Sequence, residues 1–166
     1  MHPDRHFRWA GATDHGLLAD IMFDAVRNGE SRYREAQRQA WVPEPRSGPE
    51  WEARLAGQDV ILAEEAGRGV GFMSLAENGY VDFAYIRPEA QHRGLFGEML
   101  ARIVERATAK GETRLWVHAS LMAEPAFARF GFEVTRREQV ALGGETFDRC
   151  EMERVLQLSP AAGRAG

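Results

Sequence analysis

The sequence predicts a mixed α/β fold with one central, mostly antiparallel sheet and helices on both of its faces. Apolar residues recur at helical spacing in some segments and at strand spacing in others. Glycines and prolines mark sharp turns between these segments. The predicted order is a strand, helices, three antiparallel strands, a helix, a strand, a helix and two strands, which differs from a doubly wound Rossmann fold.

The chain opens with a short strand and a helix. Phe7 to Ala10 has the pattern of a strand. Thr13 or Asp14 can then cap a helix, because their side-chain oxygens accept hydrogen bonds from free backbone N–H groups. The apolar stripe of this helix is Leu17, Leu18, Ile21, Met22 and Val26.

Two shorter helical segments follow. Ser31 to Val42 has helical character, and the prolines and glycine after it end that helix. Pro49 with Glu50 can open a further short helix over Trp51 to Leu55, since proline is favoured in a first helical turn.

Three antiparallel strands form the next part of the chain. Val60 to Ala63 is a buried-strand pattern, and the turn Gly67 to Gly69 leads into a returning arm at Val70 to Leu75. Asn78-Gly79 is another turn signal, and it precedes a third strand over Tyr80 to Ile86.

A long amphipathic helix begins after the Arg87-Pro88 stop and ends at Gly111. Its stripe is Leu95, Phe96, Met99, Leu100, Ile103, Val104 and Ala107. A strand over Arg114 to Ala119 and a helix at about Met122 to Phe130 come next.

The last hairpin joins Phe132 to Gln139 with Thr146 to Val155 through a Gly143-Gly144 turn. We therefore place one domain at residues 1–158, and we expect residues 159–166 to form a frayed, disordered tail.

Composition excludes several classes of protein. Of 166 residues, 44% are hydrophobic and 28% are charged, as in globular proteins. The net charge of −4 argues against a nucleic-acid partner, which favours a clustered basic face. No apolar run is long enough for a membrane helix, and the N-terminus lacks the apolar core of a signal peptide. Cys150 has no partner cysteine, so we expect a reducing, cytoplasmic location and no metal site.

The segment from Ile86 to Leu100 carries the clearest functional signal. A strand ends, a loop with Gly94 and Gly97 follows, and a long helix begins. The first N–H groups of a helix have no internal partners and bind phosphate groups well. The pattern fits neither a P-loop nor the dinucleotide-binding glycine fingerprint. A turn before a packed helix is the alternative interpretation.

Gln91 to Phe96 resembles the pyrophosphate loop of the GNAT acetyltransferases, Gln/Arg-x-x-Gly-x-Gly/Ala. A second match, at the family's spacing, resembles its later Asn-x-x-Ala-x-x-x-Tyr-x-x-x-Gly-Phe motif. The matching residues are Ser120, Ala123, Phe127, Gly131 and Phe132. Ala36 to Trp41 and Met152-Glu153 are similar to a bacterial YafP-like subgroup.

Three residues depart from the family pattern. Phe96 replaces a small residue, and we assign its side chain to the core. Ser120 replaces an asparagine and can keep only part of its hydrogen bonding. Phe127 replaces the tyrosine that often protonates the departing thiolate, and a phenyl ring has no proton to donate.

The resemblance implies transfer of an acetyl group from acetyl-CoA to a small-molecule or peptide amine by direct attack. It implies that the Ala84 N–H faces the acetyl carbonyl and that Ile86 pairs with the pantetheine arm. The residues expected to bind the coenzyme are Ala84, Tyr85, Ile86, Gln91, His92, Arg93, Gly94, Leu95, Phe96, Gly97, Ser120 and Phe127.

Asp82 is the leading candidate for a catalytic base, because two-residue periodicity places it on a face with Tyr80 and Ala84. The alternative is a strand-surface aspartate in an ion pair. Tyr80 and Ser120 are weaker candidates for catalytic residues. Tyr33, Trp41 and Tyr80 are expected to line the acceptor pocket.

Other functions stay open from the sequence. One alternative is a non-catalytic acyl-CoA-binding module, because Phe127 stands where the family often has a tyrosine. Another is a transferase whose donor carries a different short acyl group. A protein-interaction domain is a third reading. A homodimer through the sheet edge or the C-terminal hairpin is compatible with the pattern.

Overall fold

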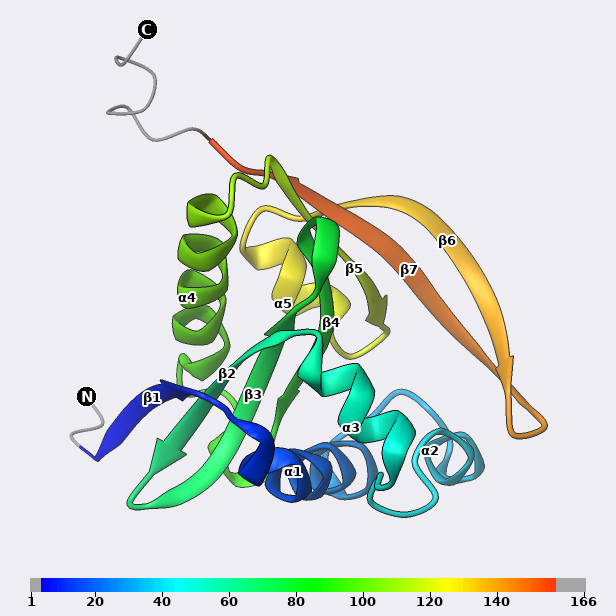
Figure 1. Ribbon diagram of the computed structural model, residues 1–166. Helices are drawn as coiled ribbons and strands as arrows, with labels where there is room; N and C mark the ends of the chain where they lie inside the picture. Colours follow the sequence, from blue (N-terminus) through cyan, green and yellow to red (C-terminus); the bar gives the residue numbers. More distant parts are fainter. Residues whose placement is uncertain (1–3, 158–166) are drawn as a thin grey trace, which may run out of the picture.

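The computed structural model describes residues 4–157, in which seven strands form one sheet (Figure 1). The order is β1-β2-β3-β4-β5-β7-β6, and neighbours are antiparallel except for the parallel pair β4 and β5. The predicted mixed α/β fold is thus confirmed, whereas the expected tail at 159–166 lies outside the described residues. The strands are β1 Arg5–Trp9, β2 Asp59–Glu65, β3 Arg68–Leu75, β4 Tyr80–Ile86, β5 Arg114–Ser120, β6 Glu133–Leu142 and β7 Glu145–Val155.

Helices cover both faces of the sheet (Figure 1). They are α1 His15–Asn28, α2 Glu35–Trp41, α3 Pro49–Ala56, α4 Leu95–Ala109 and α5 Glu124–Arg129. One apolar cluster joins α4 and α5 to the sheet, and a second joins α1 and α3 to the opposite face. In the part of the chain that the structure describes, no helix is long and apolar enough to cross a membrane.

The predicted stripes of α1 and α4 point into these two clusters. Leu18 and Ile21 of α1 and Met99 and Ile103 of α4 are fully buried. The second helix begins later than expected, at Glu35 rather than Ser31. The Ser31 hydroxyl accepts a 3.0 Å hydrogen bond from the Tyr33 N–H, a local turn that competes with helix formation.

A β-bulge in β4 changes which side chains share a face. Leu75 of β3 pairs with Val81, but Met73 pairs with Ala84, so β4 carries one extra residue at this point. Val81 and Ala84 therefore both pack on the α4 side of the sheet. Asp82 instead contacts α3 on the opposite side. The expectation that Asp82 and Ala84 share a face is wrong, because strict alternation fails at a bulge.

The parallel strands β4 and β5 separate soon after they meet. Within residues 4–157 they pair at Tyr80 with Trp116 and at Val81 with Val117, near the beginning of β4. The remainder of β4 is paired with β3 alone. The sheet thus opens on the β5 side of β4. The opening includes Ala84 and Ile86, for which the family resemblance implies contacts with the thioester and the pantetheine arm.

Gly79 sets the start of β4 against β5. Its φ is +75°, and a Cβ atom there would lie 2.1 Å from the Arg114 carbonyl oxygen. We predict that Gly79→Ala lowers the free energy of unfolding by about 3 kcal/mol, because it adds strain and a backbone clash. Urea denaturation followed by circular dichroism measures the effect. Gly16→Ala, in α1 with free space around it, is the control and should be neutral or stabilising. Equal stability of the two variants would contradict the prediction.

Candidate active site

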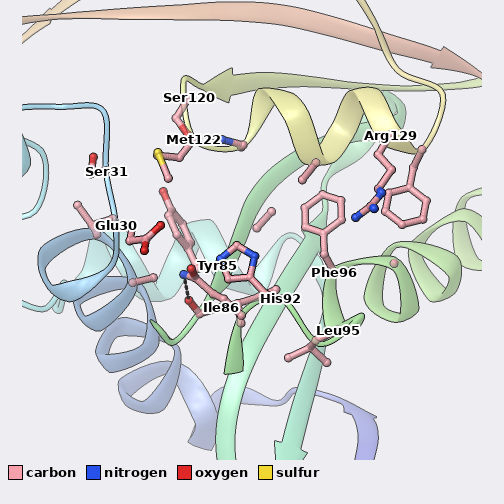
Figure 2. Close-up of a pocket in the computed structure, with 18 of the residues that line it drawn as sticks. Glu30, Ser31, Tyr85, Ile86, His92, Leu95, Phe96, Ser120, Met122 and Arg129 are labelled. Atoms are coloured by element: carbon pink, nitrogen blue, oxygen red, sulfur yellow. Dashed lines mark hydrogen bonds between the residues drawn. The ribbon is translucent and has the colours of Figure 1, made fainter. Parts of the chain in front are cut away.

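A cavity of about 430 Å³ lies where β4 and β5 diverge (Figure 2). Its walls come from the end of β4, the loop and first turn of α4, the β5–α5 turn with α5, and the C-terminal end of α1 with α2. It therefore joins the loop predicted to bind a diphosphate to the helical region predicted to bind an acceptor.

The free edge of β4 forms the centre of the cavity wall. The Arg87 N–H donates a 2.8 Å hydrogen bond to the Val70 carbonyl on β3. Because backbone groups alternate in direction along a strand, those of Ala84 and Ile86 point toward β5 instead. The Ile86 carbonyl accepts a 3.0 Å hydrogen bond from the Gln91 amide (Figure 2). Ala84 keeps backbone groups that face the cavity.

The loop before α4 has the backbone conformation of an anion site. His92 and Gly94 have φ values of +62° and +82°, and Arg93 lies between them. Residues with positive φ turn the backbone sharply and can gather neighbouring N–H groups on one side. Gly94 is the N-cap of α4, and no side chain caps the helix. The first N–H groups of α4 are therefore available to a ligand.

Residues at the end of α5 complete this part of the cavity. Gly97 lets α4 approach Phe130, since a Cβ atom at Gly97 would lie 2.6 Å from the Phe130 Cζ atom. Arg129 also lines the cavity here and brings a fixed positive charge (Figure 2). Arg129 was not among the expected site residues, although it lies within the second matched motif.

Two phenylalanines in the matched motifs have different environments. Phe127 is 1% exposed and lies outside the cavity, with its ring 4.9 Å from those of both Phe96 and Phe132. The expected contact of Phe127 with the coenzyme is therefore not supported, because the ring is buried in the core. Phe96 packs against the same core and also lines the cavity, so its assignment to the core describes only one of its contacts.

Tyr85 presents a phenol group to the cavity. Its ring packs against Phe72, Phe83 and Trp41, with centroid distances of 5.9 to 6.3 Å. Burial raises the pKa of Tyr85 well above its ordinary value, so the hydroxyl is protonated at neutral pH. In Figure 2 the hydroxyl points toward Ser120 and Met122 at the β5–α5 turn.

Asp82 lies outside the cavity-lining set. Its carboxylate accepts hydrogen bonds from Arg54 Nη2 at 2.6 Å, Arg54 Nε at 2.8 Å and Gln58 Nε2 at 2.6 Å. The Asp82 side chain is 7% exposed. Arginine and glutamine thus occupy both carboxylate oxygens, and the group does not face the cavity, so Asp82 is poorly placed to take a proton from an acceptor bound there.

Tyr80 also lies outside the cavity, whereas Ser120 lines it. The Tyr80 hydroxyl and His118 Nδ1 are 2.9 Å apart and share a hydrogen bond. Burial, with the charge of Arg149, lowers the pKa of His118. The Ser120 hydroxyl accepts a 3.2 Å hydrogen bond from the Ala123 N–H at the start of α5.

Of the two N-terminal aromatic residues expected to line the acceptor pocket, only Trp41 does so. Trp41 lines the cavity, as predicted for a pocket residue. Tyr33 does not line it, is 7% exposed and fastens three segments together. Its hydroxyl donates to the Asp148 carbonyl at 2.6 Å and accepts from the Leu121 N–H at 3.0 Å. Tyr33 thus holds the β5–α5 turn that forms one cavity wall.

The Arg93 side chain points away from this cavity. It forms a 2.6 Å ion pair with Glu65, which also binds Arg5 at 2.8 Å. Arg5 donates a further hydrogen bond to the Arg93 carbonyl at 3.3 Å. Arg93 was expected to bind the coenzyme, but acidic partners occupy its guanidinium, which instead holds the loop to β2.

Glu30 and Met122 also line the cavity, and neither belongs to a sequence motif.

The Cys150 thiol does not line the cavity, and burial raises its pKa to about 11. A thiol with so high a pKa is a poor nucleophile at neutral pH.

Comparison with known proteins gives consistent matches. A family model described as an acetyltransferase (GNAT) domain matches residues 30–149. The uncharacterized N-acetyltransferase YafP of Escherichia coli K12 is 32% identical over 135 residues, which cover 81% of this chain and 85% of that protein.

Solved structures show the same fold. A GCN5-related N-acetyltransferase from Rhodopseudomonas palustris has a TM-score of 0.85 and 26% identity, and the match covers 94% of this chain and 98% of that one. The structure of yncA from Salmonella typhimurium, solved with its cofactor acetyl-CoA, has a TM-score of 0.66 and 22% identity, with 93% and 95% covered.

The bridging role of Tyr33 leads to a stability prediction. Tyr33→Phe keeps the ring but leaves the Leu121 N–H and the Asp148 carbonyl without this partner. We expect the free energy of unfolding to fall by about 1–3 kcal/mol. Chemical denaturation measures the change, and Tyr80→Phe, which removes a hydroxyl bonded to a side chain, is the control. Unchanged stability of Tyr33→Phe would count against the bridge.

Proposed function

Because the chain belongs to the GNAT acetyltransferase family, we propose that it transfers an acetyl group from acetyl-CoA to a primary amine that attacks the thioester directly. The main support is one cavity that combines the free edge of β4 with the uncapped start of α4. The first feature suits a thioester and pantetheine, and the second suits a diphosphate.

The coenzyme is proposed to bind with its diphosphate on the loop from His92 to Gly97. Positive φ at His92 and Gly94 supports this, as does the charge of Arg129. Acetyl-CoA in the Salmonella neighbour is consistent with the same ligand here. Backbone N–H groups, not side chains, would contact the diphosphate. The replacement of the family's small residue by Phe96 is therefore compatible with binding.

The thioester is proposed to lie along the free edge of β4. The Ala84 N–H is the donor suited to the acetyl carbonyl, whose oxygen gains negative charge as the amine attacks. Ser120 lines the cavity with its hydroxyl oxygen already bonded to the Ala123 N–H, so its hydrogen remains free to donate. These groups would position and stabilise the reacting carbonyl.

Proton handling requires a residue other than Phe127. As the C–N bond forms and the C–S bond breaks, the amine loses one proton and the sulfur gains one. Tyr85 is the tyrosine that lines the cavity, and the hydroxyls of Tyr33 and Tyr80 are engaged elsewhere. We therefore assign the hydrogen bond to the departing sulfur to Tyr85. The ion pair with Arg54 disfavours Asp82 as the base.

Calorimetry with coenzyme A and thiol release with a panel of primary amines test the function together. Binding should stabilise the protein by about 2.7 kcal/mol at 100 times the Kd. Gly94→Glu should abolish binding, because a carboxylate would face the diphosphate, whereas Gly94→Ala tests the backbone strain alone. Absence of binding by the unmodified protein would reject the proposal, and binding without thiol release would indicate a non-catalytic module.

The role of Tyr85 gives a separate kinetic prediction. Tyr85→Phe should lower kcat by about 100-fold with little change in the KM for acetyl-CoA, since a transition-state hydrogen bond is lost. Because burial raises the pKa of Tyr85, the unmodified enzyme should show no loss of activity from its ionisation up to about pH 10. Tyr80→Phe is the control, and an undiminished kcat for Tyr85→Phe would exclude the assignment.

A further inference from the structure

The charged residues that line the cavity are separated by sign. Arg129 is at the end formed by α4 and α5. Glu30, which follows α1, is the acidic side chain of the lining set. Figure 2 shows its carboxylate directed toward Tyr85, on the side away from Phe96 and Arg129. An anionic coenzyme group and a cationic acceptor group would therefore be attracted to opposite ends.

Nearby arginines do not neutralise Glu30. Arg27 donates to the carbonyls of Val42 and Pro43 at 3.2 and 3.1 Å. Arg38 donates to the carbonyls of Val26 and Gly29 at 2.7 and 2.6 Å. Within residues 4–157, the exposed Glu30 carboxylate is left without a hydrogen-bonded or ion-paired partner.

Aromatic rings complete the surroundings expected of a cation site. Trp41 and Tyr85 line the same end of the cavity, with their ring centroids 6.2 Å apart and their planes inclined at 58°. The electron-rich faces of tryptophan and tyrosine attract ammonium groups. One carboxylate beside two such rings favours a ligand that is both cationic and partly apolar.

The reacting nitrogen is a poor match for this carboxylate. Alkylamines resemble the lysine side chain, whose ordinary pKa is about 10.4, and a neighbouring carboxylate stabilises the protonated form further. A protonated amine has no lone pair with which to attack the thioester. The carboxylate is therefore better suited to a positive group that does not react.

We propose that Glu30 binds a second positive charge of the acceptor, so that the preferred substrates are diamines or other amines with a cationic group beyond the acetylated nitrogen. This inference rests on the proposed acetyl transfer. One ammonium group lies at Glu30 beside the rings of Trp41 and Tyr85, while the other nitrogen, deprotonated, reaches the thioester beside Ala84.

Two other arginines bear on this assignment. The charge of Arg46 acts on Tyr85, and its buried Nε has no partner in the described chain, but Arg46 does not line the cavity. The charge of Arg32 acts on Glu124 at the start of α5. An acceptor carboxylate near Arg46 is the competing arrangement, and it would favour zwitterionic amino acids over diamines.

The test compares diamines with monoamines of equal length. We would measure kcat/KM by thiol release for putrescine against butylamine and for cadaverine against pentylamine. The wild type should favour each diamine roughly tenfold beyond the statistical factor for two equivalent nitrogens. Glu30→Gln should remove this preference and leave the KM for acetyl-CoA unchanged. Glu44→Gln, at an exposed position outside the cavity, should behave as wild type.

The outcomes separate the inference from the proposed function. Equal use of diamines and monoamines, a preference for glycine over both, or a diamine preference that survives Glu30→Gln would overturn the role of Glu30 while acetyl transfer stood. If the protein binds coenzyme A but acetylates none of these amines, the role of Glu30 fails, and thiol release with the wider panel of primary amines decides whether the proposed function stands.

Discussion

The early separation of β4 from β5 is the feature on which the rest of the site depends. Pairing ends at Val81 with Val117, and the backbone groups of Ala84 and Ile86 then face a cavity instead of a neighbouring strand. Unpaired backbone groups are costly when they are buried without a partner. Gln91 satisfies the Ile86 carbonyl, and Ala84 retains groups for a ligand. An interruption in the sheet thus leaves backbone groups of β4 exposed to the cavity.

Core packing and hydrogen bonds connect the segments around this opening. Phe127 fills the core between Phe96 and Phe132, so the position where the family often has a catalytic tyrosine serves packing here. Tyr33 joins the segment after α1 to the β5–α5 turn and to β7. The Tyr33 bonds and the contact of Phe96 with Phe127 each join segments far apart in the chain, and these segments supply residues to the cavity wall.

Local signals were enough to predict the loop before α4, and they failed for side chains whose surroundings come from distant segments. Gly94, with its positive φ, and the uncapped helix start are encoded within a few residues. The face of Asp82 depends on a bulge set by pairing with β3, and its carboxylate on Arg54 of α3. Glu30 and Arg129 became cavity residues only through the packing of α1 and α5.

The sequence alone determined the order of strands and helices, the sharp turns and the glycine-led start of α4, because glycine conformations, proline stops and apolar periodicity act over short distances. The tertiary structure decided which phenol reaches the cavity, which carboxylates are neutralised by arginine, and how the charges are divided between its ends. Those features depend on contacts between residues remote in sequence, and on a bulge that shifts side chains from one face of the sheet to the other.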